Sequence, residues 1–336
     1  RRMPPCLRAK EFRHACGNKS TQSTAEQPSS SLRLSLLSDT RLRYLLRNLK
    51  NISNSRHVVR RIEVHGSPRP TLSKTVHMAF QLNLETLQLE PDGEVVRIWF
   101  NRPESRNAHN QQMVKEVGDL FTALNSQSEF RVAVLGGRGK SFCAGADRKE
   151  QVPDPTNDLE ARYLGQLGRR AARAIEDCEV VTIGRIHGHA IGGGCCFATS
   201  CDFRVSTSDA LFYVPEVELG VPLPWGATPR LIHEIGAARA RQMILTSERI
   251  DGTKAAEWGL VHEVVENEGD LDPVIDRWTE RILSLPAMSV QMSKYQMRGY
   301  SQMSRMGDLS EFDGDASARA IRTADAQGRF GNFGSD

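Results

Sequence analysis

The stretch from Ile191 to Asp202 constrains the fold more than any other part of the sequence. Three consecutive glycines at 192–194 follow an apolar run over 180–186 and open a second apolar segment. The first run predicts a buried strand, and the glycines expose backbone N–H groups where a helix would begin. N–H groups at a helix N-terminus stabilise negative charge on a ligand. The segment therefore predicts an oxyanion-binding site within an α/β fold.

The chain from residue 84 onward alternates the patterns of strands and helices. Alternating apolar residues on both sides of a turn at 91–93 predict a hairpin, and apolar residues at helical spacing predict amphipathic helices. After about residue 270 the pattern is helical only, so we expect a core over 78–270 and a helical region over 271–336. Beyond the hairpin, the expected elements are helices over 110–125, 159–177, 227–247, 252–258 and 273–285, and strands over 131–135, 180–186, 203–206 and 210–213.

Residues 1–77 differ from the rest of the chain in charge. They hold 16 of the 44 Lys and Arg residues but only 4 of the 41 Asp and Glu residues of this 336-residue chain. This segment is expected to be a disordered or artefactual leader upstream of Met78. Its composition also fits a mitochondrial transit peptide or an RNA-binding extension. Without a transit peptide, the expected location is the cytoplasm. No run of about 18 apolar residues predicts a membrane span.

The loop from Gly136 to Asp147 is the second candidate site. Gly139-Lys140-Ser141 is similar to part of a nucleotide-binding P-loop, but Val134 stands where that motif requires glycine. The strand ending at Ile186 is not followed by a dinucleotide fingerprint either. What remains is a strand, a glycine turn and a run of small residues, which allow a ligand to approach the backbone. A tight turn without a ligand is the alternative.

Glu216 is the third candidate, because it lies in the apolar run from Tyr213 to Val221. Burial would raise the pKa of its carboxyl toward a value useful for proton transfer. A charge at a helix N-terminus is the alternative interpretation for a Glu that follows Pro. Glu218 is not expected to pair with Glu216 in either strand or helix, and we interpret it as solvated or structural.

The seven cysteines raise the question of a metal site or disulfides. Cys195, Cys196 and Cys201 lie close to His187 and His189 in sequence, but their spacing matches none of the usual structural zinc patterns. We therefore interpret them as small side chains that face the core, and expect no metal. The cysteine spacing indicates a reduced intracellular protein rather than a disulfide framework.

Together these segments resemble the crotonase (enoyl-CoA hydratase/isomerase) superfamily over roughly residues 82–300. The motifs are specific at the level of the superfamily but not of the reaction. In chain order they are Asn101-Arg102-Pro103 with Asn107-Ala108, Phe142-Cys143-Ala144-Gly145-Ala146-Asp147, Gly188 with Gly192-Gly193-Gly194 and Cys201-Asp202, Pro215-Glu216 with Leu219-Gly220, and Thr246 with Gly259-Leu260-Val261.

The resemblance implies a spiral of ββα repeats whose C-terminal helices pack in a homotrimer or a dimer of trimers. It implies an acyl-CoA thioester as substrate and no metal or redox cofactor. From the sequence itself we expect no membrane partner, and nucleic acid is the less favoured partner of the basic extension. The backbone N–H groups of Ala146 and Gly193 would form the oxyanion hole, and Glu216 would be catalytic. The other residues expected to contact substrate or CoA are Asn107, Ala108, Ala144, Asp147, Lys149, Gly192, Cys196 and Trp225.

The chain departs from the hydratase pattern at Cys196, where hydratases of this family carry the first of two glutamates. A thiol is a poor general acid or base near neutrality, so a single glutamate that moves a proton between two carbons favours enoyl-CoA isomerisation. A dienoyl-CoA isomerase is disfavoured, since Pro224 stands where such enzymes carry an aspartate. The C-terminal Ala-Phe-x-Glu-Lys-Arg motif that contributes CoA contacts is also missing. An enoyl-CoA hydratase and a noncatalytic CoA- or RNA-binding homologue are the alternatives.

Overall fold

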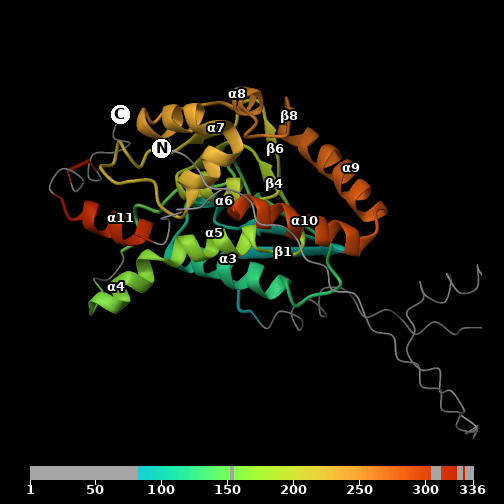
Figure 1. Ribbon diagram of the computed structural model, residues 1–336, viewed down its shortest axis with the longest axis horizontal. Coiled ribbons are helices and arrows are strands. Elements are labelled where there is room, and N and C mark those ends of the chain that lie inside the picture. The colour runs from blue at the N-terminus through green and yellow to red at the C-terminus, as the bar shows by residue number, and fades with distance from the viewer. Residues whose placement is uncertain (1–81, 152–154, 304–311, 324–327, 330–336) are drawn as a thin grey trace, which may run out of the picture. The chain divides into compact units, whose positions relative to one another are not determined.

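The computed structural model describes residues 82–151, 155–303, 312–323 and 328–329 (Figure 1), so the expectations for residues 1–77 lie outside the described residues. None of the helices in this described part has the length and apolar character needed to cross a membrane. The elements in chain order are β1 (Leu87–Asp92), β2 (Val95–Phe100), α3 (Gln111–Leu124), β3 (Val132–Gly137), α4 (Asp158–Gly165), α5 (Leu167–Glu176), β4 (Val181–Ile186), β5 (His189–Ile191), α6 (Gly193–Ser200), β6 (Phe203–Thr207), β7 (Leu211–Tyr213), α7 (Ala227–Leu245), α8 (Gly252–Trp258), β8 (Glu263–Val265), α9 (Leu271–Ser284), α10 (Ala287–Met303) and α11 (Asp313–Ile321).

The strands form a main sheet in the order β1-β2-β3-β4-β6-β8 and a small sheet of β5 and β7. The predicted hairpin is confirmed, because β1 and β2 pair antiparallel around Gly93, which adopts a positive φ of 57°. The later pairs in the main sheet are parallel, with helical crossovers between the strands. The units β4-β5-α6 and β6-β7-α7 repeat the same order, which is the spiral of ββα units that the resemblance implies.

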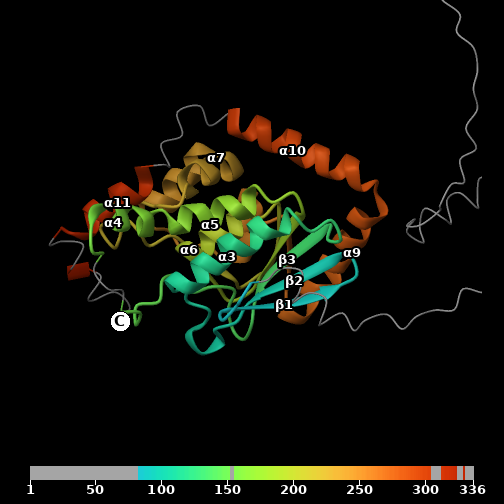
Figure 2. The same ribbon diagram turned by 90° about the horizontal axis from the view of Figure 1, so that it is seen from below.

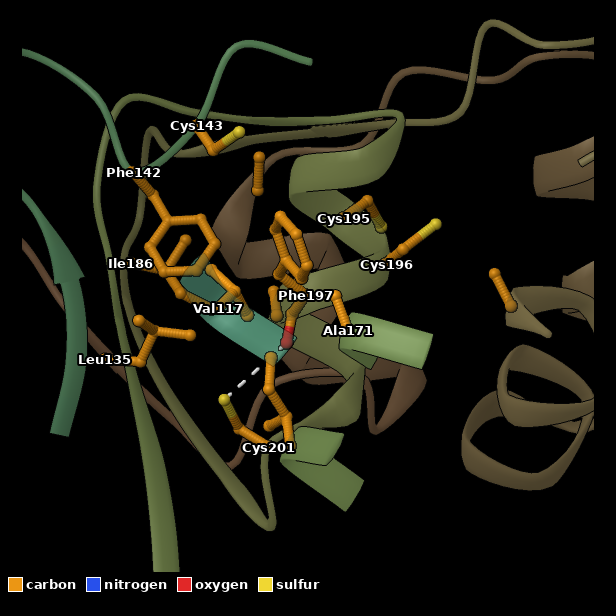
Figure 3. Packing of buried hydrophobic residues seen from close by; sticks show 14 of the residues in the cluster. Val117, Leu135, Phe142, Cys143, Ala171, Ile186, Cys195, Cys196, Phe197 and Cys201 are labelled. Carbon is orange, nitrogen blue, oxygen red and sulfur yellow. Dashed lines mark hydrogen bonds between the residues drawn. The ribbon is translucent and has the colours of Figure 1, made fainter. Parts of the chain in front are cut away.

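Helices cover both faces of the main sheet, which explains why its central strands are apolar throughout. Val132 and Val134 of β3 pack with Leu271 of α9 on one face. On the other face, Leu135 packs among α3, α5 and α6, whose helices lie together in the two views of Figures 1 and 2. Figure 3 shows this second cluster around Phe197 of α6. The core therefore holds α6, and with it the three glycines, against the sheet.

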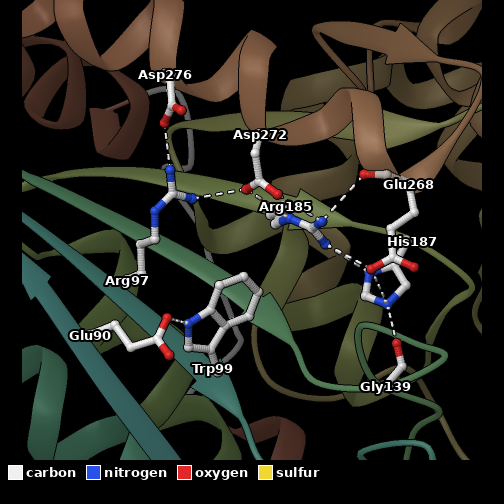
Figure 4. Close-up of polar contacts among 9 residues, drawn as sticks. All are labelled: Glu90, Arg97, Trp99, Gly139, Arg185, His187, Glu268, Asp272 and Asp276. Atoms are coloured by element: carbon white, nitrogen blue, oxygen red, sulfur yellow. Dashed lines mark hydrogen bonds and ion pairs between the residues drawn. The ribbon is translucent and has the colours of Figure 1, made fainter.

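A network of charged side chains fixes α9 to the sheet (Figure 4). Arg185 of β4 is only 5% exposed and donates two hydrogen bonds of 3.1 Å to the carboxylate of Asp272. Arg97 of β2 donates to the same carboxylate at 3.0 Å and to Asp276 one turn later at 2.5 Å. Two strands and one helix are thus held together, by a bidentate pair between Arg185 and Asp272 and by Arg97, which bridges two carboxylates of α9.

The structure differs from the predicted elements in small details. The helix expected over 159–177 is two helices that meet at Gln166, and α7 contains a kink where Gly236 adopts a φ of 78°. The short strands β5 and β8 were not predicted, because each has three residues and begins with a polar one, His189 or Glu263, rather than forming a continuous apolar run as β7 does.

Arg204 of β6 joins four segments from within the core. Its side chain is fully buried, and its guanidinium donates to the carbonyl oxygens of Leu260 (2.5 Å) and Cys201 (2.7 Å) and pairs with Glu234 of α7. Removing one member of a buried pair leaves the other members without partners, which is more costly than losing a surface pair.

We expect Arg204→Met to lower the free energy of unfolding by about 3 kcal/mol, because it leaves these oxygens unpaired in the core. Chemical denaturation measures the loss. Arg239→Met is the matched control, since the exposed Arg239 donates to a single carbonyl, that of Trp258, and should cost less than about 0.5 kcal/mol. Equal losses in the two variants would contradict this account of Arg204.

Candidate active site

The three glycines build the start of α6. Gly192 precedes the helix with a φ of 51° and is held by a 2.8 Å hydrogen bond from its N–H to the carbonyl of Tyr213. Within the described residues, no group of the protein accepts a bond from the N–H of Gly193, the first residue of the helix. A Cβ at Gly193 would lie 2.7 Å from the indole of Trp225 and closer still to Nε2 of His109. Glycine is required here because two rings approach the backbone.

The loop of Ala146 lies beside this helix start. Cys143 donates to the carbonyl of His189 at 2.7 Å and accepts from the N–H of Ile191 at 3.0 Å, so the loop is bridged to β5. On its other side, His109 donates to the carbonyl of Gly145 at 2.7 Å. In the described part of the chain, these bonds leave the N–H of Ala146 without a protein acceptor. Both predicted oxyanion donors therefore belong to segments that adjoin β5.

Glu216 lies in a turn after β7, not at a helix N-terminus, and is 9% exposed. Burial raises the pKa of its carboxyl to about 7. Among the described residues, Oε2 has no hydrogen-bond partner. Oε1 lies 3.0 Å from the position that a Cβ on Gly192 would occupy. The carboxyl thus stands beside Gly192, which precedes the expected oxyanion donor Gly193, and a pKa near 7 lets it take or give a proton near neutrality.

A cavity of about 670 Å³ opens onto these groups. Ala144, Ala146, Gly192, Gly193, Cys196, Glu216 and Trp225 of the expected site residues line it. Its apolar wall comes from α4 (Ala161, Leu164), from the turn containing Val221 and Pro224, and from α11 (Ala318, Ile321). A volume of this size suits a small organic ligand in a mostly apolar site.

The C-terminal helix α11 reaches the cavity although the sequence lacks the familiar C-terminal CoA motif. It packs on α4 through two glycines: a Cβ at Gly314 would lie 2.5 Å from the carbonyl oxygen of Gly165. Asp313 also accepts a 2.9 Å bond from the N–H of Gly226, beside Trp225. The sequence pattern gives no sign of this contact, since it depends on two small residues that are 149 positions apart.

Four residues expected to contact substrate or CoA lie outside the lining of this cavity: they are Asn107, Ala108, Asp147 and Lys149. Asn107 is fully buried and uses both amide hydrogens within the chain, for the carbonyls of Arg138 (2.8 Å) and Ser141 (2.7 Å). Asp147 pairs with Arg102 at 2.7 Å and accepts from the backbone N–H of Lys149 at 3.0 Å. Their side chains and backbones shape the loop that carries Ala146.

Cys196 faces the cavity one turn into α6, but its thiol is poorly suited to proton transfer. Burial, and next the charge of Glu216, raise its pKa well above the ordinary value. The five cysteines in the described part of the chain are all buried and unpaired by disulfides, as Figure 3 shows for four of them. The interpretation of these cysteines as small core-facing residues is confirmed for Cys195 and Cys201, whereas Cys196 both packs in the core cluster and lines the cavity.

Trp225 forms both a cavity wall and part of the core. It adopts a φ of 66°, which is rare for a side chain of this size. Its indole fills the space above Gly168 of α5, where any Cβ would overlap it, and its carbonyl accepts from Arg230 at 2.9 Å. Gly168 and Arg230 thereby hold an unfavourable backbone conformation in place.

His109 is a cavity residue that the sequence analysis did not identify. It follows Asn107-Ala108 directly, and its ring lies 4.9 Å from that of Trp225 between centroids. Burial lowers the pKa of the imidazole to about 4, so it is neutral at pH 7. Its position directly after the Asn107-Ala108 motif could have identified His109 as a site residue from the sequence.

The described residues contain no group of three or more His, Cys, Asp or Glu side chains arranged to hold a metal ion. The polar groups at the cavity are instead one carboxyl, one neutral imidazole, and two N–H groups from the backbone. That set can stabilise an oxyanion and move a proton.

Comparisons with known proteins agree with this geometry. Residues 90–329 match the family model described as "Enoyl-CoA hydratase/isomerase". The chain is 37% identical to the crotonyl-CoA hydratase of Syntrophomonas wolfei over 62% of its own length and 80% of that protein. It is 31% identical to the peroxisomal Delta(3,5)-Delta(2,4)-dienoyl-CoA isomerase of Arabidopsis thaliana, over 63% and 80%. The crystal structure of an enoyl-CoA hydratase from Bacillus anthracis superposes with a TM-score of 0.61 at 29% identity, over 74% and 96% of the chains. The chain belongs to the enoyl-CoA hydratase/isomerase (crotonase) family, whose enzymes act on acyl-CoA thioesters.

Proposed function

We propose that this protein isomerises 3-enoyl-CoA thioesters to 2-enoyl-CoA thioesters, with Glu216 as the single proton carrier. The observation that carries the proposal is the buried Glu216 carboxyl, of raised pKa, against Gly192 and one residue from the N–H of Gly193, with a thiol in place of a second carboxyl. The thioester oxygen would accept hydrogen bonds from the N–H groups of Ala146 and Gly193. Each such donor contributes about 3 kcal/mol to stabilising an enolate.

The proton moves between two carbons of the acyl chain. The carboxylate of Glu216 takes a proton from C2, and the electron pair of the broken C–H bond delocalises onto the thioester oxygen. The enolate then collapses as Glu216 returns the proton to C4, and the double bond moves from C3–C4 to C2–C3. Nothing is consumed, and one carboxyl suffices because it acts first as base and then as acid. Purified protein with 3-hexenoyl-CoA tests this, through the absorbance of the conjugated product.

Hydration of 2-enoyl-CoA is the second candidate, favoured by the relatives. The crotonyl-CoA hydratase named above is more similar to this chain than the isomerase is, at 37% against 31% identity. In hydration, Glu216 would accept a proton from a water molecule and then give a proton to C2. Both candidate reactions use the same oxyanion donors, but only hydration also requires a group that holds a water molecule.

We expect Cys196→Glu to raise the hydration rate of crotonyl-CoA at least tenfold, because it supplies a second carboxylate on the cavity face of α6. The loss of absorbance of the conjugated thioester measures hydration. Cys196→Gln is the matched control, since it has the same size and no ionisable group. A rise of equal size with Gln would show that space, not the carboxylate, limits hydration.

A further inference from the structure

The imidazole of His109 stands very close to the proposed oxyanion hole. A Cβ on Gly193 would meet Nε2 of His109 within van der Waals distance, and a Cβ lies about 2.5 Å from its own backbone nitrogen. Nε2 is therefore within about 5 Å of the Gly193 nitrogen by covalent geometry. The carboxyl of Glu216 approaches the preceding residue, Gly192. The imidazole and the carboxyl thus approach two successive glycines, Gly193 and Gly192, and both groups line the same cavity.

The ring is held in this position by its neighbours. It lies against Trp225, and its edge meets Phe197 of α6 at 6.3 Å between centroids. Its backbone bonds to Gly145 and Asp147 at 2.7 and 2.9 Å, on either side of Ala146. The residue that places one oxyanion donor therefore also places an imidazole beside the other.

The two ring nitrogens of His109 make no hydrogen bond to other groups within the described part of the chain. Among the described residues, the hydrogen bonds of His109 are those of its backbone, and neither ring nitrogen bonds to a side chain or carbonyl. The neutral imidazole offers one N–H donor and one acceptor. The ring is partly exposed to the cavity, so a ligand atom that replaces solvent on one of its nitrogens contributes about 0.5–1.5 kcal/mol.

We propose that Nε2 of His109 accepts a hydrogen bond from an O–H group at the reacting end of the bound acyl chain. When the thioester oxygen is bound to the N–H of Gly193, C2 and C3 of the acyl chain lie two and three bonds from that oxygen and within reach of the imidazole. A hydroxyl on one of these carbons can hydrogen-bond Nε2 of His109, whereas a methylene cannot. The inference rests on the proposed placement of the thioester. The oxygen belongs either to a water that adds to the chain or to a hydroxyl that the chain already carries.

For a water, the step balances with the groups present. The water oxygen bonds to C3 of a 2-enoyl thioester while one of its protons passes to the carboxylate of Glu216. The π electrons move to the thioester oxygen, and Glu216 then gives that proton to C2. His109 accepts a hydrogen bond from the second O–H of the water and keeps its own proton. The imidazole would orient the water in place of the carboxyl that Cys196 lacks.

Calorimetric binding of two thioesters tests the inference. Butyryl-CoA and 3-hydroxybutyryl-CoA differ only in the hydroxyl, and each is titrated into wild type, His109→Leu and His109→Gln. We expect His109→Leu to reduce the preference for the hydroxylated thioester about tenfold, and His109→Gln, which keeps a hydrogen-bonding group, to recover most of it. Butyryl-CoA binding shows in the same experiment that each variant is folded.

The outcomes separate the two proposals. An unchanged ratio of the two affinities in His109→Leu, whether both are weakened or neither is, overturns the role of His109. Failure of the wild type to bind either thioester overturns the proposed function. Crotonyl-CoA hydration shows which group His109 bonds. A tenfold fall in the ratio of hydration rate to isomerisation rate in His109→Leu would show that His109 bonds the water. An unchanged ratio of rates with an altered binding preference would show that it bonds a hydroxyl of the acyl chain.

Discussion

Replacement of Glu216 by Gln is expected to lower kcat for 3-enoyl-CoA at least a thousandfold. Gln fills the same space but cannot accept the proton from C2, and the thiol of Cys196, whose pKa burial raises further, offers no substitute at neutral pH. For the wild type, kcat/KM should rise with pH through a midpoint near 7, because the carboxylate is the active form and burial raises the pKa to about 7. Glu218→Gln, two residues away on the exposed side of the turn, is the matched control.

The same replacement should stabilise the fold at high pH. The pKa of Glu216 is about 7 in the folded protein against 4.5 for an ordinary carboxyl, so the folded state binds the proton more tightly. The free energy of unfolding of the wild type therefore keeps the full contribution of Glu216 below pH 4.5. It falls as pH rises from 4.5 through 7, and above pH 7 it is about 3 kcal/mol lower. The advantage of Glu216→Gln should be absent at pH 4 and present at pH 8 in chemical denaturation. Full activity in the variant would exclude Glu216 as the proton carrier.

Much of this site can be predicted from the sequence because each part is local. Apolar runs reveal the buried strands, three glycines mark the start of α6, and the apolar neighbours of Glu216 indicate the burial that raises its pKa. The three segments then meet because parallel strands bring the ends of successive ββα units to one edge.

The features that could not be predicted depend on contacts between distant residues. His109 reaches Gly193 through the bridge between His109 and Ala146, which no local pattern encodes. The docking of α11 depends on the contact of Gly314 with Gly165. Asn107 is a further example, because its amide bonds to two carbonyls of the loop that follows β3, more than 30 residues away in the sequence.

Gly193→Ala is expected to lower kcat/KM at least a hundredfold while the protein stays folded. The new Cβ would lie 2.7 Å from the indole of Trp225 and closer to His109, so the rings or the first turn of α6 must move. The N–H of residue 193 then no longer points at the thioester oxygen, and losing one such donor costs a factor of about 100 to 1,000. Steady-state kinetics with 3-hexenoyl-CoA measures the effect.

Thermal unfolding separates this effect from a general loss of structure. Alanine is a better helix former than glycine by about 1 kcal/mol, so the substitution at the first residue of α6 offsets part of the strain from the rings. Gly269→Ala is the control, because its Cβ would meet nothing within 4 Å and the residue lies outside the cavity lining. If Gly193→Ala kept activity within a few-fold of the wild type, the N–H of Gly193 would not be the oxyanion donor, and the thioester would have to bind elsewhere along the wall that Trp225 and Glu216 share.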